Sequence, residues 1–421
     1  MLGEQTADVL IDGAVIVDVA PRCSGERVLD ADGLVLLPGL VDLHTHLREP
    51  GREDAETIAS GSAAAALGGF TAVHAMANTD PVADNAAIVE DVWRRGRETG
   101  LVEVRPVGAV SRGLGGEHLA DLATMARSAA AVRVFSDDGR CVHDSRLMRR
   151  ALEYVKAFDG VVAQHAQDPR LADGGACCHE GEVSGRLGLA GWPAVAEESI
   201  IARDVMLAEH TGSRLHVCHV STGGSVDVLR WAKRRGVDVT AEVTPHHLLL
   251  TCDLVESYDP VFKVNPPLRC AADVVELRAA LAEGVIDAVA TDHAPHASQD
   301  KDQAFAEAAF GMLGLETALG VVAEAMVQTG LLDWAGVADR MSVRPARIGR
   351  VAGQGGALRV GEPANLTLVD PAAQAPVQPE RFASLSRNTP FAGRTLPARV
   401  VATFLRGRPT VVDNALAAVP A

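Results

Sequence analysis

The segment 42–48, Asp-Leu-His-Thr-His-Leu-Arg, places two histidines and an arginine at alternate positions. It follows the apolar run 34–37, which predicts a β-strand. Side chains two residues apart on a strand point to the same face, roughly 6.6–7 Å apart along the backbone, so His44 and His46 can reach one metal ion. Arg48 continues that face and can grip a carboxylate through two hydrogen bonds. A His-x-His pair on a strand is often only polar surface, so this segment alone leaves both interpretations open.

Other residues that can bind metal stand in similar places. Each directly follows a short apolar run that predicts a strand. These residues are Asp138, His165, His219 and Asp292. Together with the first two histidines they form a set of four imidazoles and two carboxylates, which suits a pair of borderline metal ions, with zinc first. Each residue alone is more simply explained as core or surface, but six at matching strand ends favour a metal site.

The apolar runs alternate with helical patterns such as 145–158, 194–210 and 225–235. Alternating strands and helices predict a parallel sheet, and seven or eight such units predict a (β/α)8 TIM-like barrel over residues 39–346. Catalytic groups of this fold sit at the carboxyl ends of the strands, where every candidate ligand falls. Residues 1–38 and 347–421 contain short β-type runs instead. We expect them to pair into a small β-sandwich domain formed by both termini.

Composition excludes several classes of protein. The formal net charge of −16 argues against a nucleic-acid groove, which needs a basic stripe. Glu4, Asp8 and Asp12 stand near the N-terminus and no basic residue precedes Arg22, so the N-terminus is not predicted to be a signal peptide. Residues 57–79 are apolar but rich in Ala, Gly and Ser, which predicts a buried helix and a buried strand, not a membrane span.

The seven cysteines are odd in number and form no regular framework. Cys177-Cys178-His179 resembles part of a zinc cluster, but no second Cys-x-x-Cys completes it. Reduced thiols in a cytoplasmic protein are the simpler expectation.

Several longer motifs stand in order along the chain, at 44–51, 76–79, 135–139, 242–247, 263–269, 290–296, 342–346 and 386–391. Any one motif can recur by accident, whereas the ordered set is specific. Together the motifs resemble those of the dihydroorotases of the amidohydrolase superfamily. The likeness is to the bacterial class in which an aspartate bridges two metal ions, and it covers nearly the whole length.

The resemblance implies a role for each metal ligand. It assigns His44, His46 and Asp292 to the more buried of two zinc ions, and His165 and His219 to the other. Asp138 would bridge both ions. Asp137 is its rival, which composition cannot separate, although the family pattern favours the second aspartate. Asp292 would also act as general base and acid, while His216, His246, His247 and His293 would support the ligands.

The resemblance also implies the substrate and the residues that bind it. The reaction would be the reversible hydrolysis of the cyclic amide of (S)-dihydroorotate to N-carbamoyl-L-aspartate, a step of de novo pyrimidine biosynthesis. Arg48, Asn78 and His296 match residues that grip the substrate carboxylate, and His46 faces the same pocket. Asn265 and the backbone of Phe310 and Gly311 match groups that line the ring.

The chain departs from the family pattern in two places. Members usually open with one more strand before the segment 8–13, and here that strand is missing or very short. The run 163–168, Ala-Gln-His-Ala-Gln-Asp, also differs from the commoner His-Cys-Glu-Asp, which keeps the ligand His165 but changes its neighbours.

Two other kinds of function compete with this one. Dihydropyrimidinases, hydantoinases and allantoinases use a carboxylated lysine as the bridge, but no lysine precedes Lys156. A non-catalytic scaffold for aspartate transcarbamoylase should have lost metal ligands, and all six are present. We expect a homodimer, since closed two-fold oligomers are commonest. A complex with aspartate transcarbamoylase is a further possibility that the family implies.

Overall fold

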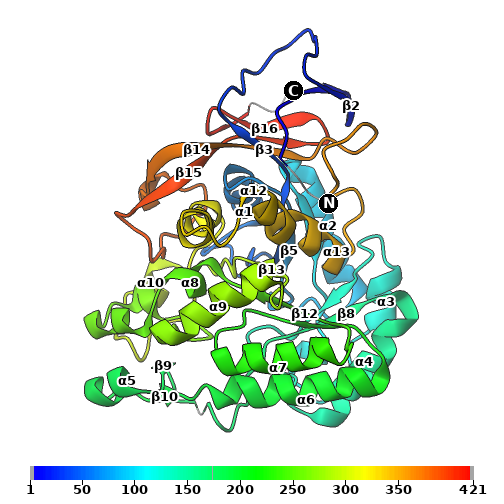
Figure 1. The fold of residues 1–421 in the computed structure, drawn as a ribbon. Helices are drawn as coiled ribbons and strands as arrows, with labels where there is room; N and C mark the ends of the chain where they lie inside the picture. Colours follow the sequence, from blue (N-terminus) through cyan, green and yellow to red (C-terminus); the bar gives the residue numbers. More distant parts are fainter. Residues whose placement is uncertain (1–3, 173, 418–421) are drawn as a thin grey trace.

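The computed structural model describes residues 4–172 and 174–417, and a barrel of parallel strands lies at its centre (Figure 1). A three-stranded sheet has the order β4-β5-β6, and a five-stranded sheet has the order β13-β12-β11-β8-β7. Parallel bridges from Thr45 to His293 and from Gly108 to Phe135 join the two sheets at both edges. The sheets therefore close into one eight-stranded barrel, and the predicted (β/α)8 fold is confirmed.

The barrel strands are short and apolar. All residues of the first two are buried, as expected where helices cover a parallel sheet. The strands are β4 (Leu40–Thr45), β5 (Phe70–Ala75), β6 (Glu103–Pro106), β7 (Val134–Phe135), β8 (Val161–Gln164), β11 (Leu215–Val217), β12 (Val239–Val243) and β13 (Ala288–Val289). A smaller parallel pair, β9 (Cys178–His179) and β10 (Gly191–Trp192), lies in the connection after β8.

Helices surround the barrel. In α4 the inward residues recur at helical spacing from Leu147 to Val155, and the Asp144 carboxylate caps its first turn by accepting from the Leu147 N–H at 2.7 Å. The helices are α1 (Ile58–Leu67), α2 (Ala86–Thr99), α3 (Leu122–Arg127), α4 (Ser145–Val155), α5 (Glu182–Leu187), α6 (Val195–Thr211), α7 (Gly223–Arg234), α8 (Pro245–Leu249), α9 (Ala271–Glu283), α10 (Ser298–Lys301), α11 (Ala318–Val322), α12 (Trp334–Ala338) and α13 (Arg344–Ile348).

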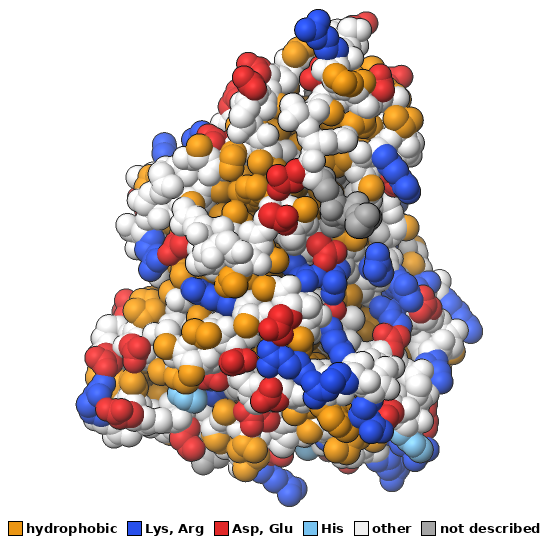
Figure 2. Space-filling view, viewed as in Figure 1, with side chains coloured by type: hydrophobic (Ala, Val, Ile, Leu, Met, Phe, Trp, Pro, Cys, Tyr) orange, Lys and Arg blue, Asp and Glu red, His pale blue; other side chains and the backbone are white. Residues whose placement is uncertain are grey.

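The predicted buried helix and strand of the segment 57–79 are α1 and β5. Among the residues that the structure describes, no helix is long and apolar enough to cross a membrane. On the face in Figure 2, acidic and basic side chains are interspersed over α7 and its neighbours. Arg230 of α7, for example, pairs with Glu283 of α9 at 3.1 Å.

Both ends of the chain form a second unit at one end of the barrel, where blue and red strands lie together in Figure 1. Its five-stranded antiparallel sheet has the order β17-β16-β15-β14-β3, and the hairpin β1-β2 packs on it through Ile16, Ala364 and Leu366. The expected β-domain built from both termini is confirmed. The strands are β1 (Asp8–Asp12), β2 (Val15–Ala20), β3 (Val35–Pro38), β14 (Leu366–Pro376), β15 (Thr395–Leu405), β16 (Arg408–Val412) and β17 (Ala415–Leu416).

The residue boundaries of the two domains stay a prediction. Helix α13 crosses the expected end of the barrel at residue 346. Residues 4–7 form no strand before β1, whereas residues 1–3, where the family's extra strand would begin, lie outside the described residues.

Candidate metal centre

The six predicted ligands meet at the carboxyl ends of the barrel strands. Each is at most 5% exposed, although they come from five different strands or the turns that follow them. The parallel arrangement accounts for this convergence, because strands that run in one direction end at the same rim of the barrel. The ligands are His44 and His46 at β4, Asp138 after β7, His165 after β8, His219 after β11 and Asp292 after β13.

Two carboxylates lie against the histidines of β4. His44 Nε2 is 3.2 Å from Asp138 Oδ1 and 3.5 Å from Asp292 Oδ1. His46 Nε2 is 3.3 Å from Asp138 Oδ2 and 3.1 Å from Asp292 Oδ1. These four side chains therefore surround one small volume.

A second group shares Asp138 with the first. His165 Nδ1 and His219 Nε2 are 2.9 Å apart, and they lie 3.4 and 3.6 Å from Asp138 Oδ1. Asp138 Oδ1 thus faces His44, His165 and His219, and its Oδ2 faces His46, so the carboxylate lies between the two groups as a bridging ligand must.

Hydrogen bonds to residues around the metal ligands fix the tautomers of three of the histidines. His44 donates through Nδ1 to Glu242 at 2.8 Å, and His46 donates through Nδ1 to the Asn78 side-chain oxygen at 2.9 Å. His165 donates through Nε2 to the Gln167 side-chain oxygen at 2.8 Å. A neutral imidazole that donates from one nitrogen presents a lone pair at the other. All three lone pairs then face carboxylate oxygens, so the arrangement needs cations between them.

Two buried polar atoms without hydrogen-bond partners also indicate that cations belong between these side chains. His44 Nε2 and Asp138 Oδ1 are buried and have no hydrogen-bond partner, which is costly unless an ion completes them. The residues present therefore fit one or two divalent ions.

The two adjacent aspartates after β7 have different surroundings. Asp137 Oδ1 accepts the backbone N–H groups of Val110 and Ser111 at 2.8 and 2.9 Å, and its other oxygen accepts the Ser111 hydroxyl. Asp137 is fully used in holding this loop, whereas Asp138 points at the histidines. This contrast favours Asp138 over Asp137 as the bridge.

Three residues of the site have left-handed backbones: Arg48 with φ 59°, His219 with φ 31° and Asp292 with φ 47°. Such conformations are costly for residues other than glycine and cluster at functional sites. Each follows a strand that the barrel holds in place. The strain is therefore confined to the turns that aim these side chains inward.

Arg48 lies beside the cluster with an unusual set of partners. Its Nε donates to the Pro295 carbonyl at 3.0 Å, and its Nη2 is 3.4 Å from His296 Nε2. Among the described residues, no carboxylate approaches its guanidinium within 4.0 Å. Burial lowers the pKa of Arg48 to about 10, and it remains a cation at neutral pH. A partly buried cation without a counter-charge is a ready receptor for an anionic ligand.

The other predicted substrate residues lie on the same side. His296 donates from Nε2 to the Phe310 carbonyl at 2.6 Å, and burial lowers its pKa to about 3. Gly311 has φ 141°, and a Cβ there would lie 2.8 Å from His296 Nε2, so only glycine fits. Asn265 donates to Gln167 at 3.2 Å and leaves its own side-chain oxygen buried and unpaired.

Two residues that contact the ligand histidines, Glu242 and Gln167, had no role assigned from the sequence. Glu242 accepts from His44 and, through its other oxygen, from His216 at 2.9 Å. Hydrogen bonds from His216 and His44 outweigh burial and hold the pKa of Glu242 at about 2. Gln167 joins His165 to Asn265. Glu242 lies near the carboxyl end of β12 and Gln167 follows β8, and these positions were the available signal, since carboxylates and amides commonly orient metal-binding histidines.

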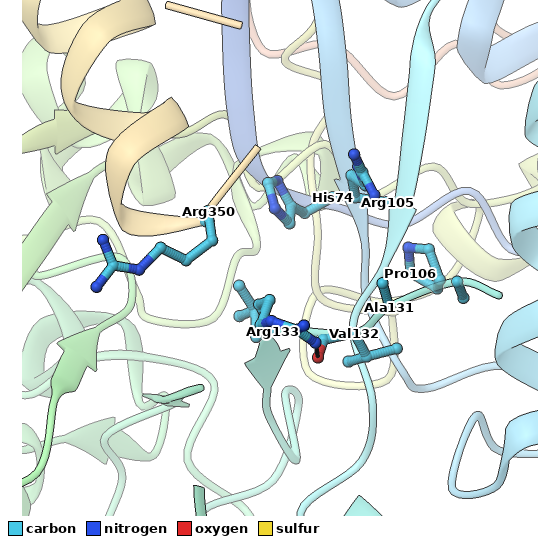
Figure 3. A pocket seen from close by; sticks show the side chains of 10 residues that line it. His74, Arg105, Pro106, Ala131, Val132, Arg133 and Arg350 are labelled. Carbon is cyan, nitrogen blue, oxygen red and sulfur yellow. Dashed lines mark hydrogen bonds between the residues drawn. The ribbon is translucent and has the colours of Figure 1, made fainter. Parts of the chain in front are cut away.

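A separate small cavity lies where β7 begins, at the barrel end away from Asp138 (Figure 3). His74 and Arg105 lie side by side on it, while the Arg350 side chain extends away from them (Figure 3). Its arginines do not converge on one point, so this cavity does not form the candidate site.

The chain has close relatives of known name. A family model described as Dihydro-orotase-like matches residues 33–225. The chain is 66% identical to the dihydroorotase of Streptomyces coelicolor over 99% of this chain and 97% of that protein. It is 57% identical to the dihydroorotase of Mycobacterium tuberculosis over 98% and 97% of the two chains.

Solved structures share the fold at lower identity. An L-hydantoinase (dihydropyrimidinase) from Arthrobacter aurescens aligns with a TM-score of 0.85 and 24% identity, over 98% of this chain and 94% of that one. A dihydropyrimidinase from Brevibacillus agri aligns with a TM-score of 0.82 and 23% identity, over 97% and 92%. At these identities the likeness establishes the barrel and the β-domain alone.

Proposed function

The chain belongs to the dihydroorotase family, and from this premise we propose how its site works. The protein is a cyclic amide hydrolase that interconverts dihydroorotate and N-carbamoyl-L-aspartate. We propose two zinc ions per subunit. His44, His46 and Asp292 would hold one ion, His165 and His219 the other, and Asp138 would bridge them, an arrangement that the two converging ligand groups support.

The single observation that carries the substrate assignment is Arg48. Its guanidinium borders the metal ligands and lacks a carboxylate partner among the described residues. Dihydroorotate carries a carboxylate on its ring, which would supply the missing charge in a geometry suited to two hydrogen bonds. Asn78 and His296 would help to hold the same carboxylate, and Asn265 with the backbone of Phe310 and Gly311 would line the ring.

Ring opening needs a strong nucleophile and a polarised carbonyl. When bound, the two ions would polarise the ring carbonyl and lower the pKa of a water toward about 7. Asp292 Oδ1 lies 3.1 Å from His46 Nε2 and 3.5 Å from His44 Nε2, which places its carboxylate beside the metal ligands where it can accept a proton. Asp292 would take the proton of the attacking water and deliver it to the ring nitrogen as the C–N bond breaks. Ring closure would use the same groups in reverse.

The residue type at the proposed bridging position argues against hydantoinase-type chemistry, which uses a carboxylated lysine there. At the end of β7 this chain has Ser136, Asp137 and Asp138, and no lysine stands there to be carboxylated. Neutral hydantoin rings also give no use to the charge of Arg48. We propose further that the enzyme is a cytoplasmic homodimer. A complex with aspartate transcarbamoylase is the alternative assembly to test.

The decisive experiment is an assay of the isolated, purified chain. We expect it to open dihydroorotate, to close carbamoyl-aspartate, and to contain one to two equivalents of zinc. Gel filtration of the same sample would measure its oligomeric state. Opening of dihydrouracil or hydantoin as fast as dihydroorotate would refute the substrate assignment. Activity that appears only after addition of aspartate transcarbamoylase would establish the complex as the working form.

A further inference from the structure

Two of the four lysines in the chain lie together beside the substrate pocket. Lys263 directly follows the 3-10 turn η4 (Pro260–Phe262) and is 3% exposed, and Lys301 ends α10 and is half-buried. Lysine is rarely buried in proteins, because its ammonium group loses solvation. One buried and one half-buried lysine in a chain with only four lysines therefore call for a specific reason.

Both ammonium groups donate to backbone carbonyls of one neighbourhood. Lys263 Nζ donates to the Ala306 carbonyl at 2.7 Å. Lys301 Nζ donates to the Ala309 carbonyl at 2.8 Å and to the carbonyl of Lys263 itself at 3.1 Å. Among the described residues neither lysine forms an ion pair within 4.0 Å. The hydrogen bonds of both amino groups therefore hold backbone carbonyls.

The segment they hold is 302–311, which follows α10 and has no regular secondary structure. Five of its residues, 302–304, 306 and 307, are exposed, whereas Phe305 and Ala308 are buried. Apolar packing therefore anchors the middle of the segment, and the exposed positions on either side rely on hydrogen bonds of the backbone. The Gly311 N–H donates to the Lys263 carbonyl at 3.0 Å, which ties the end of the segment to the same lysine.

Lys263 also contacts the side chain of Phe310, whose backbone is proposed to line the substrate ring. Its Nζ lies 4.3 Å from the centre of the Phe310 ring, a cation–π contact, while Trp192 packs edge-on against the same ring with centroids 6.0 Å apart. The Phe310 carbonyl in turn receives the hydrogen bond from His296. The position of His296 beside Arg48 thus depends on the position of Phe310.

We propose that Lys263 and Lys301 are positioning residues that clamp segment 302–311 and so hold the Phe310 and Gly311 backbone and the His296 ring in place for the substrate. This inference rests on the proposed function of those groups in binding dihydroorotate. Burial, and then the charge of Lys263, lower the pKa of Lys301 to about 7. A neutral amine still donates hydrogen bonds, so the clamp does not depend on the charge of Lys301.

The test compares Lys263→Met and Lys301→Met with the control Lys156→Met. Methionine keeps the length of the stem and removes the donors. Lys156 is exposed and also donates to a carbonyl, that of Thr211 at 2.7 Å, but on the outer surface. The measurements are amide hydrogen exchange of 302–311, KM and kcat for dihydroorotate, and metal content.

We expect exchange in 302–311 to quicken by about ten-fold in both clamp variants, and KM to rise by about ten-fold with a smaller fall in kcat. Metal content and the control should match the wild type. Lys301→Met keeps the test valid if the more buried Lys263→Met fails to fold. Unchanged exchange and KM in the folded variants would overturn the clamp, and so would faster exchange spread over the whole chain with loss of metal. Inactive wild-type protein would count against the proposed function, whereas the exchange measurement needs no turnover.

Discussion

Substitution of Arg48 by methionine should separate recognition of the substrate carboxylate from the chemistry of ring opening. Methionine keeps an apolar stem of similar length and removes the charge and its donors. The guanidinium has no carboxylate partner among the described residues, so the change strands no buried anion of the protein. What is lost is its pairing with the substrate and one hydrogen bond to Pro295.

The expected magnitude follows from that pairing. A hydrogen bond to a charged group contributes about 1.5–3 kcal/mol. Loss of the pair should therefore lower kcat/KM for dihydroorotate by roughly 10- to 150-fold. Metal content should not change, because Arg48 is no part of the ligand groups.

The assay measures kcat/KM for dihydroorotate and for dihydrouracil, which has the same ring without the carboxylate. Dihydrouracil should be a poor substrate of the wild type and should lose little more in the variant. Arg52→Met is the matched control, since Arg52 lies on the same segment but pairs with Asp54 and Asp300 at the surface. An equal loss on both substrates, or a fall in metal content, would refute recognition through Arg48.

Three further predictions concern other carboxylates. Asp138→Asn should lower metal content and abolish turnover while Asp137→Asn leaves metal bound, and the opposite pattern in a metal analysis would move the bridge by one residue. Glu242→Gln keeps an acceptor for only one of its two histidines and should weaken metal affinity by roughly 10- to 100-fold in a chelator competition. Burial, with a contribution from Glu56, raises the pKa of Glu316 to about 7. The folded state then keeps this proton up to about pH 7, whereas the unfolded chain loses it near the ordinary glutamate pKa of 4.5, so stability falls as pH rises between those values. Denaturant unfolding should show Glu316→Gln gaining up to about 3 kcal/mol over wild type between pH 5 and about pH 8, and a pH-independent difference would contradict the shift.

The convergence of the six candidate ligands could be predicted from sequence, because the barrel brings the ends of its strands to one rim. Once alternation of strands and helices is recognised, polar residues after apolar runs must gather at one rim. The fold and the small β-domain follow from the same pattern. The sequence could not separate Asp137 from Asp138, because two adjacent aspartates differ only in the direction in which their side chains point. Their roles separate only when the loop amides of Val110 and Ser111 are seen to occupy the first of them.

The supporting contacts could not be predicted, because they depend on the closure of the barrel. His44 and Glu242 are 198 residues apart and meet only through the register of β4 and β12 around the barrel. Lys263 and segment 302–311 meet through irregular turns, for which hydrophobic periodicity gives no signal. Lys263 belongs to the motif 263–269, but its hydrogen-bond partner is a backbone carbonyl. Every residue has such a carbonyl, so the sequence does not show which one the lysine binds.

The hydrogen bonds made by the ligand histidines also imply that the two proposed ions would be held unequally. His44 donates to a carboxylate, Glu242, whereas His165 donates to the amide of Gln167. A carboxylate partner makes an imidazole a stronger ligand than a neutral amide does, and loss of such a partner typically costs 10- to 100-fold in affinity. We therefore expect a chelator to remove the ion at His165 and His219 first. Metal analysis during stepwise addition of chelator should show that the two ions are lost at two different chelator concentrations. Gln167→Glu, which gives His165 a carboxylate partner, should reduce the difference between these two concentrations. A single stage in the wild type, or no change in the variant, would contradict this account.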